Sequence, residues 1–173
     1  MKQLIALLLI YLLIGCSKGV HQNTSEINRI ELASTKMKFA GGVAISIDSS
    51  LLYKYARRKY KDYNYYSGRI TPQFWDTITK KLEEINFKTI PLTDNTTCCD
   101  DVIEFELIVH WRNKQRRIIR ITRPGPDSVY NTLEWIRDSY KYVKLNHIND
   151  SIKFETSLQL PIEEPPPPRK SNR

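Results

Sequence analysis

Hydrophobic and polar residues alternate along two pairs of segments in the central part of the chain. The pairs are residues 43–47 with 51–55, and residues 103–111 with 118–122. A period of two is typical of β-strands that bury one face, and the short gap within each pair indicates a β-hairpin. Apolar positions within residues 27–32 predict a short strand before the first hairpin.

A three-residue turn in each hairpin places the bulky side chains of both strands on one face. In the first hairpin this turn, at residues 48–50, sets Ile45 opposite Tyr53. In the second hairpin the corresponding turn sets Val109 opposite Ile119. We base the register on this requirement, because a slip of one residue moves every side chain of a strand to the other face.

Each hairpin is followed by apolar residues at helical spacing. The first stripe is Phe74, Trp75, Ile78, Leu82 and Ile85, and the second is Val129, Leu133, Ile136, Tyr140 and Val143. Thr71 followed by Pro72 favours a helix start, and Asp127 can cap the second helix. The pattern predicts an α+β fold: an antiparallel sheet from two β-hairpins with two helices on one face, arranged as two ββα units.

The N-terminal segment has a different pattern. Lys2 precedes an unbroken apolar run over residues 4–13. This run is too short to span a bilayer of about 30 Å, but it suits a secretory signal peptide. The run ends in Leu13-Ile14-Gly15-Cys16, which resembles the lipobox of bacterial lipoproteins. The resemblance implies that residues 1–15 are a signal peptide cleaved after Gly15, and that Cys16 receives diacylglyceryl and fatty-acyl chains such as palmitate.

The remaining chain divides into three parts. Lipidated Cys16 and the polar residues up to 26 are expected to form a flexible tether, and residues 27–160 a single domain. Residues 161–173 contain four consecutive prolines and three basic residues, which favours a disordered tail. In proteobacterial lipoproteins an Asp after the lipidated Cys favours retention in the inner membrane. Ser17 stands there, so the resemblance implies a lipid-anchored protein of the outer membrane.

The predicted domain also resembles a family of uncharacterised bacterial lipoprotein domains. The resemblance lies in a first strand at residues 27–32, a Gly-containing link, a hairpin, Gly68 shortly before a helix, a second hairpin and a last helix. It covers roughly residues 27 to 145. Members often carry a Cys-x-x-Cys-Pro-like element before the first hairpin, whereas residues 36–42 of this chain contain no cysteine. The family has no established activity, so the resemblance implies a fold and no chemistry.

Charge gives a candidate binding surface. The chain has 173 residues, 40% of them hydrophobic, and 27 basic against 19 acidic side chains, a formal charge of +8. This composition excludes collagen, coiled coil and global disorder. Basic side chains gather on the second strand of each hairpin, and the candidate residues for binding an anionic ligand are Arg57, Arg58, Lys59, Arg116, Arg117 and Arg120. The alternative is an edge strand that its charges protect from aggregation.

Residues 59–68 lose the alternation and are predicted to form a tyrosine-rich loop.

The adjacent pair Cys98 and Cys99 is the only thiol pair left after lipidation of Cys16. In an oxidising envelope the two can form a strained and reducible vicinal disulfide. They can also be two small residues at the entry of a strand. A metal site would need Asp100 or Asp101, and His110, in addition, and no Cys-x-x-Cys spacing supports it, so we assign no metal ligands and no cofactor.

Catalytic motifs are not found in the sequence. Glu104 and Glu106 fall on one strand face and can be paired carboxylates, but ion pairs with Arg120 and its neighbours across the hairpin explain them more simply. We therefore favour a non-catalytic binding module, held to the membrane by its lipid, for an acidic protein or an anionic polymer of the envelope. Nucleic acid does not fit that compartment. The alternative is a periplasmic hydrolase or thiol-redox enzyme that uses Glu104 and Glu106 or the cysteine pair.

Overall fold

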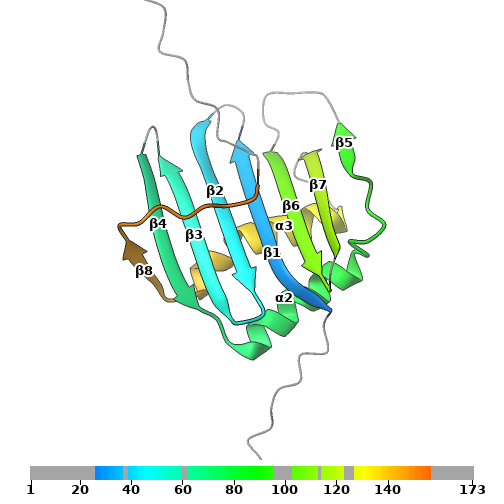
Figure 1. Ribbon diagram of the computed structural model, residues 1–173. Coiled ribbons are helices and arrows are strands. Elements are labelled where there is room, and N and C mark those ends of the chain that lie inside the picture. Colours follow the sequence, from blue (N-terminus) through cyan, green and yellow to red (C-terminus); the bar gives the residue numbers. More distant parts are fainter. Residues whose placement is uncertain are drawn as a thin grey trace, which may run out of the picture.

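The computed structural model describes residues 26–36, 39–59, 62–95, 103–112, 114–122 and 127–156. They form one twisted sheet with two α-helices packed across one of its faces (Figure 1). The α+β class, the antiparallel sheet and the two helices on one face are thus confirmed.

The sheet has eight strands in the order β5-β7-β6-β1-β2-β3-β4-β8. Their bounds are β1 Ile27–Lys36, β2 Phe39–Asp48, β3 Leu52–Lys59, β4 Asp62–Arg69, β5 Thr93–Asn95, β6 Ile103–Trp111, β7 Lys114–Thr122 and β8 Leu145–Ile148. Every neighbouring pair is antiparallel except β5 and β7, which are parallel. Strand β1 lies at the centre because it pairs with the first strand of each hairpin, β2 and β6.

The arrangement as two ββα units is not confirmed, because β4 comes between the first hairpin and its helix. The prediction of a loop over residues 59–68 is wrong for the part that the structure describes from Asp62 onward. Strand β4 pairs with β3 on one side and with β8 on the other. Most of its residues are half-buried, so no alternation of buried and exposed positions reveals it in the sequence.

The register of the first hairpin differs from the prediction by two positions. Ile45 pairs with Tyr55 instead of Tyr53, because the turn occupies residues 49–51. Leu51 takes a positive φ of 68°, and the Asp48 carboxylate accepts a hydrogen bond from the Ser50 amide at 2.9 Å. A shift of two keeps every side chain on its predicted face, so the buried face is predicted correctly.

The register of the second hairpin differs by three positions, which reverses the faces of β7. Val109 pairs with Arg116 instead of Ile119, since the turn is shorter and begins with Arg112 at a φ of 51°. Ile118 is therefore buried in the core, and Arg117 lies on the opposite face from it.

The two helices begin where the sequence predicts. Helix α2 (Pro72–Glu84) is capped by the Thr71 hydroxyl, which accepts from the Phe74 amide at 3.2 Å. Helix α3 (Ser128–Asp138) is capped by the Asp127 carboxylate, which accepts from the Val129 amide at 2.8 Å. A short 3-10 helix, η1 (Ser139–Tyr142), continues α3 and leads to β8.

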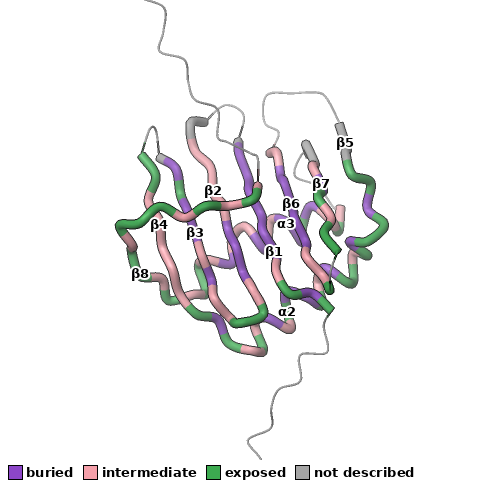
Figure 2. The backbone as a smooth tube through the Cα atoms, in the orientation of Figure 1, coloured by how far each residue is buried: buried purple, intermediate pink, exposed green. Residues whose placement is uncertain are grey.

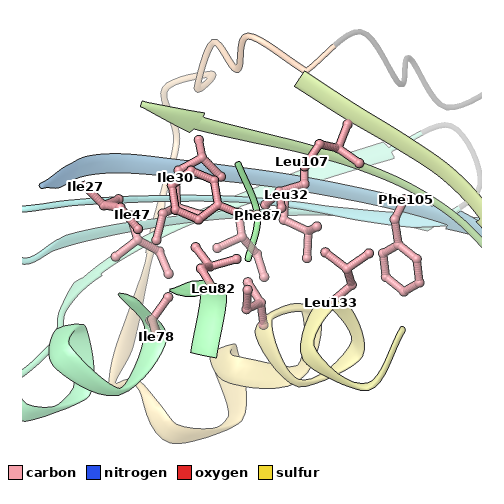
Figure 3. Packing of buried hydrophobic residues seen from close by; sticks show 14 of the residues in the cluster. Ile27, Ile30, Leu32, Ile47, Ile78, Leu82, Phe87, Phe105, Leu107 and Leu133 are labelled. Atoms are coloured by element: carbon pink, nitrogen blue, oxygen red, sulfur yellow. The ribbon is translucent and has the colours of Figure 1, made fainter. Parts of the chain in front are cut away.

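The hydrophobic core lies between the helices and the sheet (Figure 3). Isoleucine, leucine and aromatic side chains from both layers interdigitate there, and many have almost no exposed surface; the largest are Trp75, Tyr53, Tyr130, Phe87 and Phe105. The Tyr53 hydroxyl lies 2.7 Å from the Ser139 hydroxyl within this core. Burial raises the pKa of Tyr53 above its ordinary value and raises that of Tyr55 to about 12.

The other face of the sheet is crossed by the segment that follows β8, residues 149–156, which we call the strap. It runs from the β8 edge over β4, β3 and β2 to β1 (Figure 1). Its residues alternate between exposed and half-buried, while β1 beneath its far end is largely buried (Figure 2). The sheet therefore has a helix-covered face and a second face, the open face, which only the strap crosses among the described residues.

Candidate functional site

Two adjacent rows of side chains cross the middle of the open face. In one row, Glu31 of β1 pairs in register with Ser46 of β2, which pairs with Lys54 of β3. In the next row, Arg29 of β1 pairs with His110 of β6. Because side chains of a strand alternate between faces, each of these residues is the polar neighbour of buried apolar ones. The alternation that builds the core thus also assembles a polar surface on the opposite face.

The open face is hollowed beside the strap. The hollow has a volume of about 580 Å³, and its lining residues are Arg29, Glu31, Ser46, Asp48, Lys54, Arg117, Lys153, Phe154 and Glu155. Four of these are basic and three are acidic, with a single aromatic ring. Such a lining suits a charged or polar ligand held by several directed contacts.

The side chain of Glu155 fixes the strap to the sheet. Its carboxylate accepts a hydrogen bond from Arg29 Nη2 and another from Gln115 Nε2, the second at 3.2 Å. His110 Nε2 lies 3.2 Å from Glu155 Oε2. Two donors, from β1 and β7, therefore converge on one carboxylate, and the His110 ring of β6 lies beside them.

The main chain of Glu155 is bound as well. Its amide donates to Glu31 Oε2 at 2.6 Å, and its carbonyl oxygen accepts from Arg117 Nη2 at 3.1 Å. The amide of the next residue, Thr156, also donates to the Glu31 carboxylate. The sheet thus recognises this residue as part of an extended peptide, through its backbone as well as its charge.

Glu31 is a buried carboxylate, with 3% of its surface exposed. Burial raises its pKa, and the Arg29 guanidinium, 3.6 Å away, and the Ser46 hydroxyl partly oppose this shift. His110 is affected in the opposite sense: burial lowers its pKa, and Arg29 lowers it further. Glu31 and His110 thus flank one arginine in a cluster where burial disfavours the charged form of both.

The paired carboxylates Glu104 and Glu106 are placed on the open face of β6, as predicted. Glu106 has no exposed surface, and Arg117 Nε lies 3.2 Å from its Oε1. Burial and the neighbouring Glu106 raise the pKa of Glu104. In this conformation Glu106 cannot contact a substrate, so the pair does not form an exposed acid–base site.

The candidate anion-binding residues do not come together on one surface. They divide between β3 and β7, which β6, β1 and β2 separate. Arg57 is exposed, Arg58 is 8% exposed and lies over the Tyr63 ring, and Arg116 donates to the Ile90 carbonyl. Lys59 is the last residue of β3, and Arg120 pairs in register with Phe105. Of the four whose side chains the structure describes, Arg117 alone lines the hollow, and a role for the set stays a prediction.

Arg29, His110 and Glu155 were not predicted as residues of this site. For Arg29 and Glu31 the alternation of β1 carried a signal, since both charges alternate with the buried Ile30 and Leu32. Nothing local marks Glu155, because its contacts span more than a hundred residues to reach β1.

The other predicted sites lie outside the described residues. These are the lipobox with Cys16, the pair Cys98 and Cys99, and the proline-rich tail. Within the part of the chain that is described, no three His, Cys, Asp or Glu side chains gather as a metal site. None of the described helices is long and apolar enough to cross a membrane.

Comparisons with known proteins add no relative: no protein-family model, no curated protein and no solved structure matches this chain.

Proposed function

We propose that this chain is a bacterial envelope lipoprotein, anchored by lipids on Cys16, most consistent with the outer membrane. The sequence Leu13-Ile14-Gly15-Cys16 at the end of a short apolar run supports the anchor. Two or three acyl chains hold a protein on a membrane stably, where one chain does not. The domain acts as a non-catalytic binding module for an anionic partner in the envelope.

The observation that carries the binding role is the hollow on the open face, where charged side chains from four strands and the strap meet. Directed polar groups of both signs support recognition of a charged partner at this place. The resemblance of the domain to uncharacterised bacterial lipoprotein domains supports the lipoprotein assignment at the level of pattern, and carries no argument on binding.

The anchor is tested by labelling cells with radioactive palmitate. The wild-type chain, expressed in a proteobacterial host, should be labelled and should fractionate with the outer membrane. Cys16→Ala should lose the label and accumulate at precursor size, because the acceptor thiol is gone. Ser17→Ala, next to it, should stay labelled. Label that persists in Cys16→Ala rejects the lipoprotein assignment.

The binding role is tested by ionic strength. Partners retained on the purified, detergent-solubilised chain should elute with rising salt, because exposed charge pairs are screened within about 10 Å at 0.1 M. Lys54→Glu, which lines the hollow, should abolish retention, whereas Lys80→Glu on exposed α2 should not. Retention that is independent of salt, or equal loss in both variants, contradicts a charged binding face.

A further inference from the structure

The strap is held at its far end. Among the described residues, the polar contacts of the strap with the sheet converge on Glu155 and Thr156. Between β8 and Glu155 the strap passes over the hollow, and Lys153 and Phe154 line it from above. The strap is thus held by β8 at one end and by Glu155 and Thr156 at the other, and a segment that spans open space in this way can leave its place when one end is released.

The site that holds Glu155 is built by the sheet itself. Arg29, His110, Gln115 and Arg117 come from three strands whose register places them together. Arg29 Nε is buried and has no hydrogen-bond partner among the described residues, so this guanidinium has a donor left over while it binds Glu155. The site therefore has at least one hydrogen-bond donor that the strap does not use.

The contacts also specify the chemistry of an occupant. A carboxylate is bound by Arg29 and Gln115, an amide N–H by Glu31, and a carbonyl oxygen by Arg117. An inorganic anion, or an acidic polysaccharide without N-acyl groups, has no amide to offer to Glu31. An extended peptide with a Glu side chain satisfies all of these groups together.

We propose that the sheet carries a binding site for an acidic, extended peptide segment of a partner protein, and that the strap occupies this site in cis until the partner displaces it. This inference rests on the proposed binding role of the open face and names the partner class for it. The strap competes with a strong advantage, because a tethered segment acts at an effective concentration on the order of millimolar. A partner therefore binds well only where the strap is weakened or where avidity assists it.

The test uses the full-length chain and a fluorescent, end-capped peptide with the sequence of residues 150–156. The peptide should bind the Glu155→Ala chain with a dissociation constant at least about tenfold lower than that of the wild-type chain, since the competing carboxylate is gone. A matched peptide with Glu155→Gln should bind at least about tenfold more weakly than the parent peptide, because it loses the charge-assisted hydrogen bonds. Asp150→Ala, on the exposed strap without a polar contact to the sheet among the described residues, serves as the control chain and should behave as wild type.

A second variant assigns the site. Adding Arg29→Ala to the Glu155→Ala chain should abolish peptide binding, whereas adding Lys80→Ala on α2 should not. Equal affinity of the wild-type and Glu155→Ala chains overturns the proposal. So does displacement by dextran sulfate together with equal binding of the two peptides, which would make the site a general polyanion surface.

Hydrogen exchange keeps the proposal testable if Glu155→Ala fails to fold. In the wild-type chain the Glu155 and Thr156 amides should exchange at least about tenfold faster than the β1 amides, because the strap opens without the sheet. If the strap amides and the β1 amides both exchange only on global unfolding, the strap is a fixed part of the fold and the proposal is overturned. Either failure leaves the palmitate and salt experiments untouched, so it is distinguishable from failure of the proposed function.

Discussion

At the scale of single residues, the open face pairs buried carboxylates with partly exposed arginines. Glu31 and Glu106 are both nearly inaccessible, and each has an arginine beside it, Arg29 and Arg117 respectively. Removing one partner of such a pair costs more than the pair contributes, because the remaining charge stays buried. Variants of these arginines therefore report on folding as well as on binding.

Arg117→Ala should lower the free energy of unfolding by about 1–3 kcal/mol, because it removes a cation from beside the fully buried Glu106 carboxylate. Urea denaturation measures this. Lys114→Ala, exposed on the same strand, should change it by less than about 0.5 kcal/mol. Equal effects of the two substitutions contradict the role given to Arg117.

His110 should titrate below its ordinary pKa of 6.5, because burial and Arg29 disfavour the imidazolium more than the nearby Glu31 and Glu155 carboxylates favour it. A pKa that is lower in the folded than in the unfolded chain means that stability is lost as pH falls below 6.5. The wild-type chain should therefore lose more stability than His110→Gln between about pH 7 and pH 5. Ring-proton NMR gives the pKa directly, and a value above 6.5 contradicts this electrostatic account.

At the scale of elements, the sequence pattern predicts strands and helices well where one face is buried and the other is not. The alternation of β2, β3 and β6 and the caps at Thr71 and Asp127 belong to this class. Strands β4 and β8 do not, since β4 is half-buried along most of its length and β8 is only four residues long. The register of β7 failed for another reason. Its two-residue turn begins with Arg112 at positive φ, a conformation that Gly or Asn usually adopts, so the residue type at this position does not predict the turn.

The site was predicted less well than the fold, because its residues depend on pairing that local sequence does not encode. Arg29 and His110 become neighbours only when β1 pairs with β6. Glu155 reaches them only after β8 has added to β4 and turned the chain across the open face. The predicted basic residues all lie on the second strand of a predicted hairpin, but these two strands, β3 and β7, are far apart in the sheet. The distribution of charge along the sequence therefore did not locate the hollow.

Gly68 should be the residue on which the β4–β8 edge depends. A Cβ there would meet the Lys144 carbonyl oxygen at 2.5 Å and the Val143 Cγ1 at 3.1 Å. Gly68→Ala should thus destabilise the chain by about 1–3 kcal/mol through overpacking. Gly41→Ala is the matched control, since its nearest neighbour, the Arg58 carbonyl oxygen, is 3.8 Å away.

Urea denaturation of both glycine variants checks this prediction. Gly41→Ala should be neutral or slightly stabilising, because alanine loses less conformational entropy than glycine on folding. If Gly68→Ala proves no more harmful than Gly41→Ala, the close approach of β8 to β4 is not as described.

At the scale of the whole molecule, the two faces of the sheet differ in the side chains that they carry and in what covers them. One face packs against α2 and α3 and contains the hydrophobic core, and the other carries charges, the hollow and the strap (Figures 1 and 3). The net charge of +8 did not by itself point to a binding site, because basic residues are spread over separated strands. The structure narrows the candidate surface to the middle of the open face.

The central claim is that the open face, and not the helix face, meets the partner in the envelope. It is tested most directly by in-cell photocrosslinking with a photoreactive amino acid placed at Lys54, in the hollow, or at Lys80, exposed on α2. We predict a discrete protein adduct from the Lys54 position that competes with excess acidic peptide, and none from Lys80. The same adducts from both positions, or adducts from Lys80 alone, would contradict the account.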